Sequence, residues 1–121
     1  MTAIHRFEDI QAWQLGRTLV RKVYAAKFDP DVELRRQLTR ASVSVMSNIA
    51  EGFGRGHDGE FIHFLDIARG SAAEVQSLLY VCIDVAHLDE ELAEAIRHQA
   101  DECISTIAGL QAYLKESKRK G

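Results

Sequence analysis

The sequence is short of residues that interrupt or cross-link a chain. Its 121 residues include one proline, Pro30, and two cysteines, Cys82 and Cys103. A single proline favours long helices over a fold with many tight turns. Both cysteines fall at apolar positions of helical repeats, so we expect buried free thiols in a reducing compartment and no disulfide.

Long apolar runs are also missing. No stretch approaches the roughly 18 apolar residues that a membrane-spanning helix needs, and the first residues lack the charged-then-apolar pattern of a secretory signal. We therefore expect a cytoplasmic protein without a membrane partner. The content of 46% apolar and 27% charged residues is typical of soluble globular proteins. The length predicts one domain, residues 1–121.

The chain has no excess of basic charge, since its net charge is −3. This value argues against a strongly basic nucleic-acid-binding protein. The charge is unevenly distributed, however: residues 1–56 carry nine Lys and Arg against six Asp and Glu, whereas residues 57–121 carry six against twelve. Such asymmetry can direct the basic face of one subunit onto the acidic face of another. It can equally balance within the monomer, where the two halves pack together.

Motifs of common enzymes are absent as well. The glycines of segment 52–59 follow no predicted strand and precede no Gly-Lys-Ser/Thr, which excludes a phosphate-binding loop. Glu60-x-x-His63 matches one ligand pair of a di-iron helical bundle, but a second copy is missing. Histidines and cysteines show no zinc spacing, and Gly-x-Ser-x-Gly does not occur. We expect no metal, no cofactor and no enzymatic activity.

Helical periodicity, in contrast, is strong. Apolar residues at spacings of three and four predict helices from about Phe7 to Lys27, Val32 to Phe53, Asp58 to Ala86 and Asp89 to Lys115. Asp58 is the expected N-cap of the third helix. Four amphipathic helices with short links predict an all-α, up-down-up-down four-helix bundle.

The same periodicity predicts which residues face the core. In the first helix these are Trp13, Val20, Val23 and Tyr24, with Gly16 leaving a dent. In the second helix they are Leu34, Leu38, Ala41, Val45 and Ile49. The third helix has a core stripe and also a second stripe, formed by Ile67, Gly70, Ser71, Glu74, Leu78 and Val81. In so small a protein, a helix with two such faces must pack against two surfaces. One is the core of the bundle, and we expect the other to be another subunit of a ring-like homo-oligomer.

Small and polar residues interrupt the second and third helices. They are Ser47, Asn48, Glu51, Arg55, Arg69, Gly70, Ser71 and Glu74. A desolvated carboxylate must pair, so we expect Glu51 and Glu74 to accept hydrogen bonds from Arg55 or Arg69. Asn48 and Ser71 would add further hydrogen bonds. Two interpretations stay open, tight packing within one bundle and a subunit interface, and a solvated pair of Glu51 with Arg55 is the alternative for the charges.

Basic residues repeat at one-turn spacing on two helices. They are Arg17 and Arg21, Arg36 and Arg40, and a tail containing Lys118, Arg119 and Lys120. In a ring these residues would form a basic band that binds RNA or DNA through phosphates. Solvated helix faces are the alternative.

Three motifs span nearly the whole chain. They are Phe7-Glu8-Asp9-Ile10-x-x-Trp13-Gln14, Ser47-Asn48-Ile49-Ala50-Glu51-Gly52, and Glu60-Phe61-x-x-Phe64-Leu65-x-Ile67-Ala68-x-Gly70-Ser71. They resemble the 23S rRNA intervening-sequence protein family, also called four-helix bundle protein, some of whose members are encoded in insertions within 23S rRNA genes.

The resemblance implies a bacterial homopentamer whose biochemical role is not settled. It also implies a relation to the accessory protein of diversity-generating retroelements, a pentameric barrel that binds reverse transcriptase and nucleic acid. The chain departs from the family pattern at Met46, where proline is common, and at Thr39, where a basic residue is common. We therefore expect a non-enzymatic homopentameric assembly or adaptor module. The alternative is an accessory protein that binds RNA, or a nucleic-acid enzyme, through the basic band.

Overall fold

The four periodic segments form four α-helices in the computed structural model, which describes residues 4–26 and 32–120, the last three by their backbone alone. A 3₁₀ turn, η1 (Phe7–Asp9), is followed by α1 (Gln11–Ala25), α2 (Val32–Gly54), α3 (Asp58–Asp84) and α4 (Glu90–Lys120). The residues so described contain no strand.

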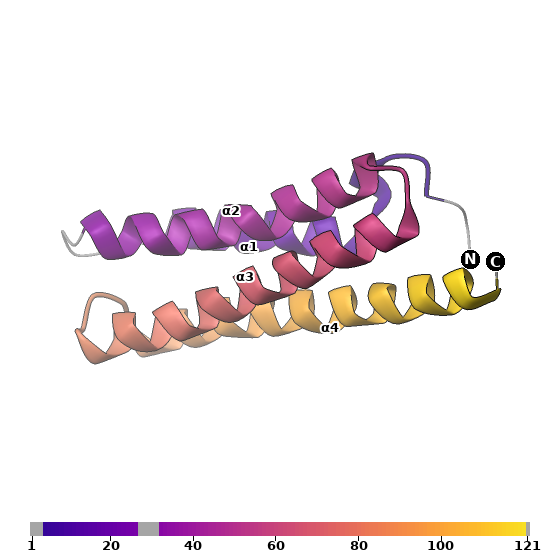
Figure 1. The fold of residues 1–121 in the computed structure, drawn as a ribbon. Coiled ribbons are helices and arrows are strands. Elements are labelled where there is room, and N and C mark those ends of the chain that lie inside the picture. The colour runs from indigo at the N-terminus through magenta and orange to yellow at the C-terminus, as the bar shows by residue number, and fades with distance from the viewer. Residues whose placement is uncertain (1–3, 27–31, 121) are drawn as a thin grey trace.

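The helices lie lengthwise beside one another (Figure 1). Within the described ranges, α1 and α3 each pack against both α2 and α4, but not against each other. The chain reverses direction between α2 and α3 and again between α3 and α4 (Figure 1). The structure therefore confirms an all-α domain with four helices.

The core positions expected in α2 are all buried. Leu38, Val45 and Ile49 are completely inaccessible, and Leu34 is the most accessible of the five at 8%. In α4, Ile96, Cys103 and Ile107 lie in the same core and are likewise inaccessible. Burial of one such aliphatic side chain contributes about 1.5–3 kcal/mol, so these stripes account for much of the driving force for folding.

The core face of α1 differs from the expected one. Ala12, Gly16, Leu19 and Val23 are its buried residues, at spacings of four, three and four. Tyr24, expected in the core, is 59% exposed, whereas Leu19 is inaccessible. Of the expected residues, Gly16 and Val23 are buried and Trp13 packs partly buried against the core, whereas Tyr24 was wrong: the core face is displaced by one position, so that Leu19 takes the buried place expected for Val20.

The start of α1 also differs from the expected helix beginning at Phe7. Ile10 has extended backbone angles, φ −77° and ψ 119°, and separates η1 from α1. This interruption places Ile10 in the core at 2% exposure. The Gln14 side chain donates from Nε2 to the carbonyl oxygen of Glu8 at 2.9 Å, which satisfies a backbone acceptor at the interruption.

The remaining helix ends are close to the expected ones. The structure places His57, not Asp58, at the N-cap of α3, and that helix ends at Asp84 because Ala86 adopts a left-handed φ of 58°. Asp89 accepts a hydrogen bond from the backbone N of Leu92 at 3.3 Å, as an N-cap residue does. The last helix continues beyond Lys115 to residue 120.

Helices α2 and α3 approach closely near the end of α2. A Cβ atom added to Gly52 would lie 2.5 Å from Cβ of Phe64 and 3.2 Å from Cδ1 of Phe61. Only a residue without a side chain fits this contact without moving a helix. Gly52 thus gives the Ser47–Gly52 motif a packing role.

Candidate functional site

A polar contact joins α2 and α3 at their middle. The hydroxyl oxygens of Ser44 and Ser71 are 2.8 Å apart. Asn48 donates from Nδ2 to the backbone oxygen of Ser44 at 2.8 Å and to its hydroxyl at 2.9 Å. Two of the predicted polar residues, Asn48 and Ser71, therefore take part in packing within one protomer. Both form hydrogen bonds with Ser44.

The charged residues of the same motif lie on the surface of the protomer. Arg55 donates to Glu51 at 2.7 Å, and their side chains are 51% and 53% exposed. This hydrogen bond raises the pKa of Arg55, and the guanidinium carbon also lies 4.9 Å from the centre of the Phe64 ring. The protomer thus shows the solvated pair, the alternative considered above. Such a pair contributes only a few tenths of a kcal/mol.

Arg69 pairs differently from the expectation. It donates to Asp66 at 3.1 Å on its own helix, so of the expected pairs the one of Glu51 with Arg55 is present, whereas Arg69 has another carboxylate partner. Residues three apart on a helix lie side by side, which makes Asp66 the nearer carboxylate. Glu74 is exposed.

The second stripe of α3 faces away from the core along most of its length. Ile67 is 40% and Val81 43% exposed, and a Cβ atom added to Gly70 would have no heavy atom within 4 Å. On α2, Val43 is 39% exposed, and Ser47 is exposed as well. Val43 lines a separate groove, described below; we call the set Ser47, Ile67, Gly70 and Val81 the outer face.

The sequence analysis missed two buried glutamines that form hydrogen bonds between helices. Gln99 is 5% exposed and donates to the backbone oxygen of Leu15 at 3.1 Å, while accepting from Lys22 at 3.2 Å. Gln111 is 2% exposed and donates to the backbone oxygen of Ile62 at 3.2 Å and to Asp66 at 2.7 Å. Both keep the helical spacing of the apolar residues of α4, and this register is the signal that predicts burial.

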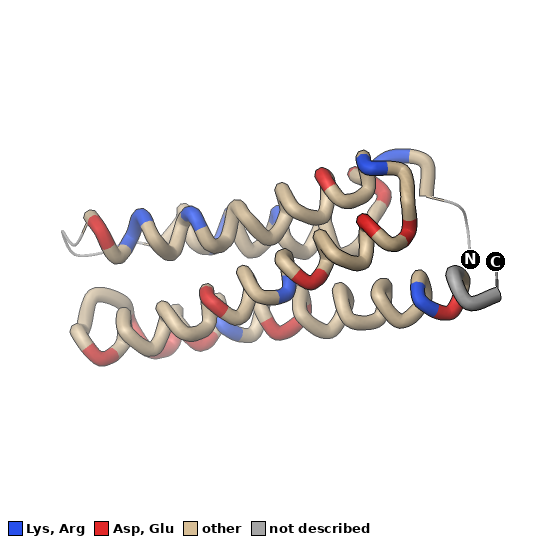
Figure 2. Tube along the Cα trace, in the orientation of Figure 1, with Lys and Arg blue, Asp and Glu red and all other residues tan. Residues whose placement is uncertain are grey.

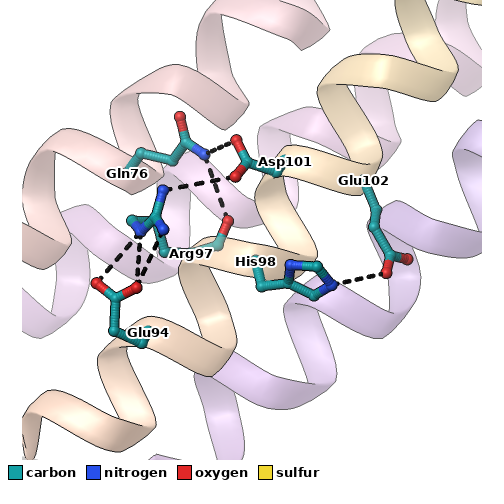
Figure 3. A network of polar contacts seen from close by, with 6 residues as sticks. All are labelled: Gln76, Glu94, Arg97, His98, Asp101 and Glu102. Atoms are coloured by element: carbon teal, nitrogen blue, oxygen red, sulfur yellow. Dashed lines mark hydrogen bonds and ion pairs between the residues drawn. The ribbon is translucent and has the colours of Figure 1, made fainter.

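A surface network links α3 to α4 (Figure 3). Gln76 donates to Asp101 at 2.6 Å and to the backbone oxygen of Arg97 at 3.3 Å. Arg97 in turn pairs with Glu94 at 3.0 Å and with Asp101 at 3.5 Å. The network places Arg97 between two carboxylates, and the hydrogen bonds of Gln76 connect the two helices.

Arginines gather instead on the first half of α2. Figure 2 shows basic bands there, whereas acidic bands are frequent on α3 and α4. An open groove of about 450 Å³ runs beside these arginines. Its lining consists of Tyr24, Val32, Arg35, Arg36, Thr39, Arg40 and Val43, and we call it the basic groove.

The basic groove contains only some of the basic residues that the sequence predicted to bind nucleic acid. Arg36 and Arg40 line it, whereas Arg17 and Arg21 are exposed on α1 outside its lining. Arg17 lies 5.8 Å from the ring centre of Trp13. Arg35 also lines the groove and was missed, although its adjacency to Arg36 is visible in the sequence. The side chains of the tail residues Lys118, Arg119 and Lys120 lie outside the described part of the structure.

A second hollow, of about 510 Å³, lies between the start of α1 and the second half of α4. The large apolar residues of its lining are Ile4, Ile10, Leu110 and Tyr113, and Asp9 and Thr106 also border it. It contains none of the predicted site residues.

Reactive groups are sparse in the described ranges. Cys82 and Cys103 are buried and form no disulfide, as expected. Burial, with a smaller contribution from the charge of Glu102, raises the pKa of Cys103 to about 12, which makes this thiol a poor nucleophile near neutral pH. Residues 4–26 and 32–120 contain no group of three His, Cys, Asp or Glu side chains arranged to hold a metal ion. None of the helices there has the length and apolarity of a membrane span.

Comparison with known proteins identifies the same family that the three sequence motifs resemble. A sequence model described as 23S rRNA-intervening sequence protein matches residues 8–109, which include all three motifs almost completely. The chain belongs to this family. A search of curated proteins gave no match.

A solved structure shows the same fold. It is the crystal structure, at 1.70 Å resolution, of a protein with unknown function from the S23 ribosomal protein family of Bacteroides thetaiotaomicron. The TM-score is 0.73 at 23% sequence identity, over 83% of this chain and 97% of the other. At this identity the likeness concerns the fold of the family and carries no activity to this chain.

Proposed function

We propose that this member of the family is a non-enzymatic assembly or adaptor module in which an up-down-up-down bundle repeats in a ring-like homopentamer. The outer face is the observation that supports the proposal. Apolar and small side chains are exposed along α3, where a solvated helix would carry charged residues. Buried thiols that form no disulfide support a cytoplasmic location for the assembly.

Gly70 gives this face a feature suited to a close contact. Open space surrounds the position in the protomer, so its lack of a side chain serves no packing within the bundle. A glycine in the middle of a helix destabilises the helix by about 0.5–1 kcal/mol relative to alanine. Close approach of a second helix backbone would compensate for this cost.

Light scattering after size-exclusion chromatography tests the assembly. One chain has a mass of 13.6 kDa, so a pentamer has a mass of about 68 kDa. We expect Ile67→Glu and Gly70→Leu to reduce the mass toward that of the monomer. Tyr113→Glu, which alters a side chain 45% exposed on α4, is the matched control and should leave the mass unchanged. A monomeric wild type at micromolar concentration would refute the proposal.

Glu51→Lys separates the two interpretations of the Ser47–Gly52 motif. The side chain of Glu51 is 53% exposed in the protomer, so reversal of its charge should affect the folding of one chain only slightly. Loss of the oligomer with retained helicity would place Glu51 at the subunit contact. Unchanged mass would confine Glu51 to the solvated pair.

A second candidate function, nucleic-acid binding, is favoured by the basic groove. Three arginines, Arg35, Arg36 and Arg40, line this groove, and a ring would repeat them in every subunit. The proposed set comprises Arg17, Arg21, Arg36 and Arg40 and, in the tail, Lys118, Arg119 and Lys120. The expected relation to the accessory protein of diversity-generating retroelements belongs to the same proposal.

Salt dependence tests this second function. Phosphate contacts release counterions, so RNA binding should weaken steeply between about 50 mM and 200 mM salt. We expect an elevated ratio of absorbance at 260 and 280 nm after purification at low salt and a normal ratio at high salt. Failure to bind any RNA or DNA at low salt would exclude nucleic-acid binding and leave the assembly proposal standing.

A further inference from the structure

The arginines of the basic groove have few carboxylate partners. Among residues 4–26 and 32–120, Arg36 contacts Glu33 at 3.9 Å, with 61% and 69% of the two side chains exposed, and neither Arg35 nor Arg40 takes part in an ion pair. Arg97 on α4, in contrast, is paired with two carboxylates. The groove therefore keeps guanidinium groups available to an external anion.

The spacing of these arginines has a cost that such an anion would remove. Arg36 and Arg40 are one helical turn apart on α2 and line the same groove. Like charges at this spacing repel each other and slightly destabilise a helix. A phosphate group between the two guanidinium groups converts the repulsion into two charge-assisted hydrogen bonds.

Apolar surface next to the arginines indicates a ligand that has an apolar part as well as a negative charge. Tyr24 on α1 lines the same groove and is 59% exposed, and Val32 and Val43 on α2 are 62% and 39% exposed. An exposed tyrosine ring beside cations offers a flat surface for a nucleic-acid base. The combination matches a nucleotide, which carries an anionic phosphate and a planar apolar base.

A single strand fits this combination better than a duplex. Bases in a duplex are stacked within the helix and cannot lie on a protein side chain, whereas bases of a single strand are free to stack on aromatic rings.

We propose that the basic groove binds single-stranded nucleic acid, with Arg35, Arg36 and Arg40 contacting phosphate oxygens and Tyr24 stacking on a base. This inference rests on the second proposed function and assigns it to one site. It adds Arg35 and Tyr24 to the predicted set and leaves Arg17 and Arg21 outside the binding groove.

Fluorescence anisotropy with a labelled oligouridylate of about 12 nucleotides, a length within the usual range of single-strand sites, tests the groove at low salt. We expect the double variant Arg35→Gln/Arg40→Gln to weaken binding at least tenfold and to lower the salt slope by about two, one for each phosphate contact. The double variant Arg17→Gln/Arg21→Gln has the same change in charge and should weaken binding clearly less than the groove variant does, because these two arginines lie outside the groove lining.

Tyr24 distinguishes stacking from general attraction. Tyr24→Leu should weaken binding about 5- to 100-fold, whereas Tyr24→Phe keeps the ring and should restore it. A duplex of the same length should bind more weakly, without dependence on Tyr24. If a poly-glutamate peptide competes as well as the oligonucleotide does, the groove recognises acidic chains and the base-stacking inference fails.

The two proposals fail in different ways. Binding that is lost in the Arg17/Arg21 variant but kept in the groove variant overturns the groove assignment and preserves nucleic-acid binding. Equal losses in both variants also overturn the assignment, because general electrostatics then suffice. Absence of binding in the wild type removes both. Each variant is checked for wild-type helicity and mass before binding is measured.

Discussion

Replacement of Gly52 by alanine tests the close approach of α2 and α3. The added methyl carbon would lie 2.5 Å from Cβ of Phe64, an atom fixed to the backbone of α3, and 3.3 Å from Cγ of the same residue. The contact with Cβ cannot be relieved by a rotation about the side-chain bonds of Phe64, because Cβ does not move with them. The end of α2 must therefore shift away from α3.

The expected cost follows from two opposed terms. Overpacking of a well-packed contact costs about 1–3 kcal/mol. Alanine is better than glycine in a helix by about 0.5–1 kcal/mol, which offsets part of that cost. We expect Gly52→Ala to lower the free energy of unfolding by about 0.5–2 kcal/mol. For a chain of this length, 1 kcal/mol corresponds to a change in Tm of about 4 °C.

Gly109→Ala is the matched control. This glycine lies within α4, and a Cβ atom added there would have no heavy atom within 4 Å. The same substitution should raise stability by about 0.5–1 kcal/mol. Urea denaturation at one total protein concentration measures both variants, since the stability of an oligomer depends on concentration. If Gly52→Ala stabilises the protein as much as Gly109→Ala does, the inferred contact with Phe64 is wrong.

Two further predictions concern buried polar groups. In a double-mutant cycle, Ser44→Ala and Ser71→Ala should show a coupling energy of about 0.5–1.5 kcal/mol, because their hydroxyls share one hydrogen bond; additive effects would contradict this contact. Burial raises the pKa of Cys103 to about 12, whereas a thiol in the unfolded chain titrates near 8.5, so the unfolded state loses its proton first. The contribution of this thiol to stability is complete below about pH 8.5 and is lost as the pH rises toward 12. Urea midpoints across this range should decline more steeply for wild type than for Cys103→Ala, and parallel curves would show that Cys103 keeps an ordinary pKa.

Helix positions could be predicted from the sequence because they depend on local spacing. The α2 stripe from Leu34 to Ile49 was predicted residue by residue, and all five side chains are buried. Tyr24 was misplaced because the α1 pattern offers two overlapping stripes, and the choice between them depends on the neighbouring helices. The interruption at Ile10 was missed because its stabilisation comes from burial and from the side chain of Gln14, which local propensity does not describe.

Polar residues were harder to predict than apolar ones. Asn48 and Ser71 were expected to form buried hydrogen bonds, but Ser44 as their shared partner follows only from the crossing of α2 and α3. Gln99 and Gln111 were missed because an amide in an apolar register can be buried only where another helix presents an acceptor. Such pairings depend on the three-dimensional contact of two helices, and the sequence of either helix alone does not specify them.

The charge asymmetry of the chain has a structural consequence that connects both proposals. Every ion pair in the described ranges joins residues at most four apart in the sequence, as in Arg55 with Glu51 and Arg97 with Glu94. Direct pairing between the basic and acidic halves thus does not neutralise the asymmetry within these ranges. An acidic face of a neighbouring copy and a phosphate strand would therefore compete for the same groove arginines. If the groove lies at a subunit contact, Arg35→Gln/Arg40→Gln reduces the oligomer mass together with nucleic-acid binding; if the groove is free for a strand, only binding falls.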